Sequence, residues 1–197
     1  MSRLTPERVK LAQDIIGRYP VARSALIPLI HLAQEQDGYV AEDAMEHIAE
    51  LIGCTPAEVY GTGTFYEMFK FEPVGTYVIG VCTNISCLLN GGYELLDHAS
   101  QKLGVRSGAT TPDGMFTLED LECLAACTEA PCMVVNYRYF HKVGSADFDR
   151  VVDGLRTGHN PEIPPHGTLS RVRQTVSADR WAGSGTAPPP RPPAEDA

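Results

Sequence analysis

The sequence predicts an α/β protein in which a helical N-terminal part precedes a small sheet. Residues 5–70 carry the apolar spacing and the capping residues of helices. From Thr76 onward the pattern changes to short runs of β-branched and apolar residues, which are typical of strands. We therefore expect three segments: a helical domain over 1–72, a sheet domain over 73–160, and a C-terminal extension over 161–197.

Two helices are expected in the first forty residues. Thr5-Pro6-Glu7 places a capping side chain before a proline at the first helical position. Ser24 is placed to cap a second helix, Ala25–Gln36, which Asp37-Gly38 ends. The first helix presents a broad apolar stripe of Val9, Leu11, Ala12, Ile15 and Ile16.

Two more helices are expected before the sheet. Glu42–Ile52 has an amphipathic pattern, and Gly53 is placed to form its left-handed C-cap. Thr55-Pro56-Ala57-Glu58 is a capping box with proline at the first helical position, so a short fourth helix starts there. We expect Gly61 and Gly63 to limit its length.

The remaining elements alternate in a way that predicts a small α/β sheet domain of thioredoxin-like type. A buried strand at Thr76–Val81 carries Cys82 at its C-terminal end. Ser145 is placed to cap the last helix. The elements expected after the first strand are a helix at Gly92–Leu103, a strand at Met115–Leu118, a hairpin of Met133–Asn136 and Tyr139–Val143, and a helix at Asp147–Arg156.

Composition and charge restrict the class of protein. Hydrophobic residues make up 43% of the chain, yet no apolar run approaches the roughly 18–20 residues of a membrane span. The N-terminus lacks a secretory apolar core, so we expect a cytoplasmic protein, in which paired cysteines more often hold metal than form disulfides. The formal net charge of −9 argues against nucleic acid as a partner.

From about residue 176 the chain is rich in Ala, Gly, Ser and Pro, which predicts a disordered tail.

Two cysteine pairs carry most of the functional information. Cys82 and Cys87 form a C-x4-C pair, and Cys123 and Cys127 form a C-x3-C pair. Folding can bring two such pairs together and present four thiolates to one metal centre. The small residues Leu124-Ala125-Ala126 between the second pair would let the backbone approach a bulky cluster. The spacing favours an iron–sulfur cluster, and with it electron transfer.

Structural zinc stays open as the main alternative, because zinc sites also use four cysteines. Against zinc, the chain lacks the C-x2-C knuckle that such sites usually contain, and the same absence removes the thioredoxin-type dithiol motif. Cys132 follows Cys127 at C-x4-C spacing and could replace a ligand, although it opens an apolar run and is as easily explained by packing. Cys54 is interpreted as a small buried hydrophobe, and His31 and His47 as surface or core residues of their helices.

Long stretches of the chain resemble one family, the thioredoxin-like [2Fe–2S] subunit of bacterial NADH–quinone oxidoreductase, respiratory complex I. The resemblance covers roughly residues 5 to 160 and leaves the tail unmatched. The matching segments are Arg23–Gln34, Asp37–Val40, Pro56–Gly61, Thr64–Tyr66, Val81 through Cys87, Glu122–Cys127 and Ala130-Pro131.

The resemblance implies one [2Fe–2S] cluster on Cys82, Cys87, Cys123 and Cys127. It implies an electron-transfer protein without a catalytic site of its own, which exchanges one electron with the flavin of a partner subunit. FMN and NADH would bind to that flavin- and NADH-binding partner, and other peripheral-arm subunits of complex I would complete the assembly at the inner face of the cell membrane.

Two other functions stay open at this point. Related subunits occur in NAD-linked formate dehydrogenases and hydrogenases, where the same chain would serve as a diaphorase subunit. In the second alternative function, a zinc ion would stabilise a scaffold that carries no electrons. A free-standing thioredoxin-like ferredoxin is disfavoured, because such a ferredoxin needs only the sheet domain and not the helices before it.

Overall fold

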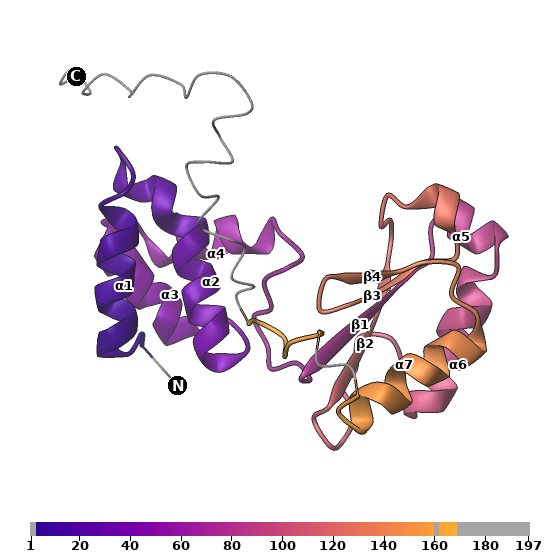
Figure 1. The fold of residues 1–197 in the computed structure, drawn as a ribbon. Helices are drawn as coiled ribbons and strands as arrows, with labels where there is room; N and C mark the ends of the chain where they lie inside the picture. Colours follow the sequence, from indigo (N-terminus) through magenta and orange to yellow (C-terminus); the bar gives the residue numbers. More distant parts are fainter. Residues whose placement is uncertain (1–2, 160–161, 169–197) are drawn as a thin grey trace, which may run out of the picture.

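The computed structural model describes residues 3–159 and 162–168, and it confirms the expected fold class. Figure 1 shows the helices α1 to α4 gathered at one side and a sheet with its own helices at the other. Each half has its own apolar core in the described residues, one built from residues 4–71 and one from residues 77–163. The helical half consists of α1 (Pro6–Ile16), a 3₁₀ turn (Ala22–Ala25), α2 (Leu26–Asp37), α3 (Glu42–Ile52) and α4 (Pro56–Thr64).

Most of the expected helix boundaries in this half are confirmed. The Thr5 side chain accepts a hydrogen bond from the backbone N–H of Arg8, and Gly53 ends α3 with a left-handed φ of 79°. The predicted cap at Ser24 is wrong. Ser24 lies inside the 3₁₀ turn that leads directly into α2, so the chain is already helical there and the start of α2 has no side-chain cap.

The fourth helix runs further than predicted. Its capping box is present: the Thr55 hydroxyl accepts from the Glu58 N–H, and the Glu58 carboxylate accepts from the Thr55 N–H at 2.9 Å. The helix then continues through both glycines to Thr64. At Gly63 a Cβ would lie 2.6 Å from the Phe71 ring, so this glycine serves close packing and does not end the helix.

The sheet has the strand order β2-β1-β3-β4. Its strands are β1 (Tyr77–Cys82), β2 (Phe116–Leu121), β3 (Met133–Val135) and β4 (Arg138–Phe140). β1 pairs with β2 in parallel, whereas β3 is antiparallel to both β1 and β4. In this register Cys82 lies opposite Leu121, so the loop that follows β2 starts beside the end of β1.

Helices α6 (Gly92–Leu103) and α7 (Ser145–Arg156) cover one face of the sheet (Figure 1). A short helix, α5 (Ile85–Leu89), precedes α6 and was not predicted. The predicted cap of the last helix at Ser145 is also wrong: the Gly144 N–H donates to the Asp147 carboxylate at 2.9 Å instead. The largest fully buried side chains of the sheet core are Phe116, Phe148, Ile79, Leu118 and Met133.

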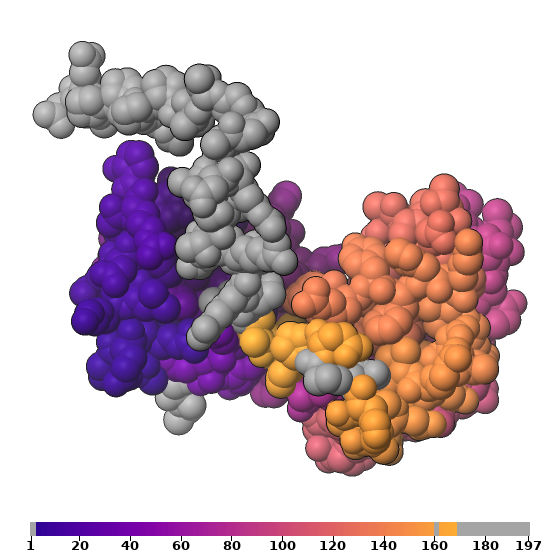
Figure 2. All heavy atoms as spheres, viewed as in Figure 1, coloured from indigo at the N-terminus to yellow at the C-terminus, as the bar shows by residue number. Residues whose placement is uncertain are grey.

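Residues 162–168, here called the return segment, run back from α7 into the space between the two halves (Figures 1 and 2). The Asn136 side-chain amide donates to the carbonyls of Thr76 and Pro164, and the His166 N–H also donates to the Thr76 carbonyl, at 2.7 Å. At Gly167 a Cβ would come within 2.8 Å of the Gln34 carbonyl oxygen. The return segment therefore joins the sheet to α2. The tail expected from residue 176 lies outside the described residues.

Candidate metal centre

One small cavity, of about 70 Å³, brings together all four predicted ligand residues. It is formed by the end of β1, by helix α5 and by the loops on either side of the turn Cys127–Glu129. Its cysteine lining consists of Cys82, Cys87, Cys123, Cys127 and Cys132. The predicted convergence of the two pairs is therefore observed, whereas their role as metal ligands stays a prediction.

The first pair is held by the junction of β1 and α5. The Cys82 N–H donates to the Cys132 carbonyl at 3.1 Å, which fixes the end of β1 against the start of β3. The Asn84 side chain caps α5 by accepting a hydrogen bond from the Ile85 N–H at 2.7 Å. Cys87, for which no helix was predicted, lies in α5 and is buried. A five-residue helix is too short for hydrophobic periodicity to reveal.

Gly92 allows α6 to start directly against the first cysteine pair. A Cβ on this residue would lie 2.8 Å from the Cys82 carbonyl oxygen and 2.9 Å from the Cys87 carbonyl carbon. Both are backbone atoms, so a larger residue would force the cysteine-bearing loop to move. The sequence marked Gly92 only as a helix start, although the Gly91-Gly92 doublet was an available sign of close packing.

The second pair lies in the loop after β2 and is exposed. Ala125 has a left-handed φ of 55°, which is uncommon for a residue with a Cβ. This conformation directs the Ala125 N–H at the Cys123 sulfur, which accepts it at 3.3 Å. Backbone N–H donors of this kind stabilise negative charge on a thiolate sulfur.

Cys132 is the most deeply buried of the five cysteines that line the cavity. Its thiol donates to the backbone carbonyls of Glu129 at 3.0 Å and Ala126 at 3.4 Å. It is fully buried and packs with Cys82 and Cys87. These two hydrogen bonds are shorter than the 3.9 Å contact of the Cys82 thiol with the Glu122 carbonyl, and together with complete burial they support the packing interpretation. Cys54 lies apart, half-buried against the helical core.

The electrostatics of the cavity favour a positively charged occupant. Burial raises the pKa of the Cys87 thiol, with a further contribution from neighbouring Cys82, and burial also raises the pKa of Cys132. Among the described residues, no cationic side chain lines this cavity. Thiolates would therefore need a metal to provide the compensating positive charge, and thiolate sulfur is the ligand that iron–sulfur clusters and zinc prefer.

Within the described part of the chain, no three His, Cys, Asp or Glu side chains, the cavity cysteines included, are grouped to hold a single metal ion. A [2Fe–2S] cluster does not need such a group, because each of its two irons takes only two of the four cysteine ligands. The two helical histidines behave as predicted. His31 packs at 4.7 Å from the Phe69 ring, and His47 accepts a hydrogen bond from the Leu4 N–H at 3.1 Å. Sequence reasoning missed His166, which is buried between the two halves. It follows a proline-rich stretch in which no periodicity predicts burial.

None of the helices in residues 3–159 and 162–168 combines the length and apolar composition that a membrane span requires.

The fold and the cysteine pattern define a class of protein, and comparison with known families agrees with it. The family model for thioredoxin-like [2Fe–2S] ferredoxins matches residues 12–156. The chain belongs to this family, which confirms the predicted resemblance and the thioredoxin-like fold.

Within the family, the chain is similar to subunits of NADH–quinone oxidoreductase. It is 42% identical over 165 residues to one such subunit of Mycobacterium tuberculosis, covering 83% of this chain and 65% of that protein. It is 40% identical over 140 residues to a corresponding subunit of Rhizobium meliloti, covering 71% and 83%. It is 37% identical over 153 residues to subunit 2 of the Thermus thermophilus enzyme, covering 76% and 84%.

A solved structure shares the fold. An NAD⁺-reducing [NiFe]-hydrogenase superposes with a TM-score of 0.61 at 19% identity, over 68% of this chain and 23% of that one.

Proposed function

We propose that this chain is an electron-transfer subunit of an NADH–quinone oxidoreductase and that it carries one [2Fe–2S] cluster. The observation that carries the proposal is the cavity lined by cysteines from two distant segments of the chain. Family membership supports the cluster, and the identity of 37–42% to NADH–quinone oxidoreductase subunits supports the assembly. When bound, such a cluster accepts and releases one electron.

The chain's own residues would hold the group in defined ways. Cys82 and Cys87 would bind from the buried side, and Cys123 and Cys127 from the exposed side. The Ala125 N–H would donate to the Cys123 sulfur, which tunes the potential of an iron–sulfur centre. Cys132 and its apolar neighbours would exclude water from the inner side.

The exposed side of the site would face the redox partner. Ile85 and Leu89 on α5 are 70% and 76% exposed, and Ile85 also lines the cysteine cavity. We place the partner, a protein that binds flavin and NADH, on this side. The other peripheral-arm subunits and the inner face of the cell membrane complete the proposed setting.

We also propose that residues 1–72 and 73–160 are separate domains.

The first test is chemical and spectroscopic. The full chain, produced anaerobically with iron–sulfur assembly machinery, should be brown, contain iron and acid-labile sulfide, and give a paramagnetic signal after one-electron reduction. Cys82→Ser, Cys87→Ser, Cys123→Ser and Cys127→Ser should each abolish or change that signal, whereas Cys132→Ser and Cys54→Ser should keep it. A colourless zinc protein would refute the proposal, and an unaltered signal in any of the first four variants would refute that ligand assignment.

A second candidate setting is the diaphorase unit of an NAD-linked hydrogenase, because that enzyme supplies a structural neighbour. Copurification from the native source separates the two. A flavoprotein together with quinone-linked membrane subunits supports the first setting, and a nickel–iron catalytic subunit supports the second.

A further inference from the structure

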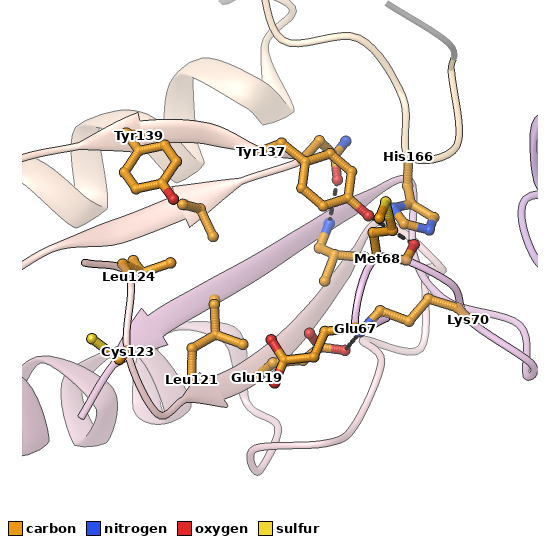
Figure 3. Close-up of a pocket in the computed structure, with 14 residues that line it drawn as sticks. Glu67, Met68, Lys70, Glu119, Leu121, Cys123, Leu124, Tyr137, Tyr139 and His166 are labelled. Carbon is orange, nitrogen blue, oxygen red and sulfur yellow. Dashed lines mark hydrogen bonds and ion pairs between the residues drawn. The ribbon is translucent and has the colours of Figure 1, made fainter. Parts of the chain in front are cut away.

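A groove crosses the face of the sheet that α6 and α7 leave uncovered (Figure 3). Its volume is about 250 Å³, near the lower end of small-molecule pockets. We call it the sheet-face groove. The floor of the groove consists of Val78, Gly80 and Val134. Its sides consist of Leu121, Leu124, Tyr137 and Tyr139. One end is formed by His166 with Met68, and the other end by Cys123.

The floor and sides of the groove suit a flat apolar ring. Gly80 keeps the floor low, since a Cβ there would overlap the Leu121 side chain. Figure 3 shows Tyr137 and Tyr139 on one side of the space and Leu121 with Leu124 on the other. Aromatic and branched aliphatic side chains bind planar rings through edge and face contacts.

Most polar side chains that line the groove already have partners within the fold. The Lys70 ammonium pairs with the Glu119 carboxylate at 2.6 Å, and both are largely buried. The Tyr137 hydroxyl donates to the Met68 carbonyl at 2.8 Å. With Lys70 neutralised and the acidic Glu67 also in the lining, the groove disfavours an anionic ligand.

His166 differs from these side chains because it is buried without a partner. Its side chain is buried, with the residue only 8% exposed, and neither ring nitrogen has a hydrogen-bond partner in the described structure. Buried polar atoms almost always have partners, so two unpartnered nitrogens at the end of a cavity indicate a missing hydrogen-bonding group. Burial and the charge of Lys70 lower the pKa of His166 to about 4, so the imidazole is neutral near pH 7 and carries one donor and one acceptor.

We propose that the sheet-face groove binds a small neutral aromatic molecule that carries a hydroxyl group, with the imidazole of His166 as its hydrogen-bonding partner. A hydroxyl donates to one imidazole nitrogen or accepts from the other, so it fits either tautomer. The flexible thioether of Met68 lies beside the imidazole (Figure 3). Both ring nitrogens are buried, so the proposal requires this side chain to rotate before a ligand reaches them. This site adjoins the cysteine cavity, because Cys123 and Leu124 line both.

Phenol is the simplest probe of the proposal. The full chain with its metal centre is titrated with phenol and followed by methyl NMR. The methyl groups of Val78 and Val134 should shift saturably and show NOEs to the phenol ring. His166→Leu should weaken binding about five- to tenfold, the value of one lost hydrogen bond. Tyr93→Phe, an exposed position on α6 outside the groove, should leave it unchanged.

Two further ligands make the test independent of the variant's folding. In the wild-type chain, toluene, which lacks the hydroxyl, and benzoate, which is charged, should each bind at least fivefold more weakly than phenol. Equal binding of toluene or benzoate would overturn the proposal. So would unchanged phenol binding by folded His166→Leu, no saturable shift up to the solubility limit, or shifts confined to methyl groups outside the groove. Loss of phenol binding on assembly with partner subunits would identify the groove as a protein interface and overturn it as well.

Discussion

His166 should make the stability of this protein depend on pH in a way that one substitution removes. Burial, with a smaller contribution from the positive charge of Lys70, lowers the pKa of His166 from 6.5 to about 4. The charged group that acts on it is Lys70, which is paired with Glu119. The folded protein therefore prefers the neutral imidazole, whereas the unfolded chain takes up a proton near pH 6.5.

The sign and size of the effect follow from that difference. The stabilisation from keeping His166 neutral is complete above pH 6.5 and is lost as the pH falls through 6.5 towards 4, because only the unfolded chain is protonated in this range. At about 1.4 kcal/mol for each pH unit between the two pKa values, the loss amounts to about 3 kcal/mol.

Urea unfolding followed by circular dichroism at several values between pH 7 and pH 4 measures this loss. Wild type should lose about 3 kcal/mol relative to His166→Leu over that range. His141→Leu, at an exposed position of the sheet half, is the matched control and should track wild type. Parallel curves for wild type and His166→Leu would refute the assignment of a buried neutral imidazole.

Three further substitutions test the packing described above. Gly92→Ala should destabilise the fold by about 1–3 kcal/mol and reduce bound iron, because its Cβ meets the backbone of the first cysteine pair. The control is Gly61→Ala, where a Cβ meets nothing within 4 Å and the change should be neutral or stabilising. Equal iron contents in the two variants would contradict the argument. Thr55→Ala should cost about 1 kcal/mol in urea unfolding through loss of the α4 cap, and no measurable change would show that the cap contributes little. Phe148→Ala, at a fully buried position, should cost about 3–5 kcal/mol, and a cost below about 1 kcal/mol would mean that the sheet core rearranges around the cavity.

The elements that the sequence predicted well are those with strong local chemistry. The capping box at Thr55 and the glycine after α3 act through neighbouring residues, so a local pattern is enough to locate them. The strand that ends at Cys82 was also predictable, because a short β-branched run is rarely anything but a buried strand.

The features that the sequence missed depend on contacts between distant segments. Helix α5 has only five residues, and its position is set by Asn84 and by the start of α6. Ser24 has the right side chain for a cap, but the preceding turn already satisfies the backbone there. The burial of His166 depends on where the return segment lies, and no pattern around that residue encodes it.

The residues of the candidate site were predictable, but the difference in exposure between its two cysteine pairs was not. The spacing of the two pairs indicated that they could meet at one centre, the family resemblance selected Cys82, Cys87, Cys123 and Cys127, and all four line one cavity together with Cys132. That one pair is buried and the other exposed follows from the different settings of the two pairs, one at the end of a central strand and the other in a surface loop. No sequence pattern predicted that two backbone carbonyls accept hydrogen bonds from the Cys132 thiol.

The return segment has a consequence for biosynthesis. Gly167 packs on Gln34, so this contact between the halves links residues far apart in the described chain. During translation the helical half emerges and gains its core long before Gly167 leaves the ribosome. This contact is therefore added late in synthesis, and a ribosome that stalls before this glycine would display two halves held together by the Lys70–Glu119 ion pair and the Tyr137–Met68 hydrogen bond but without the return segment.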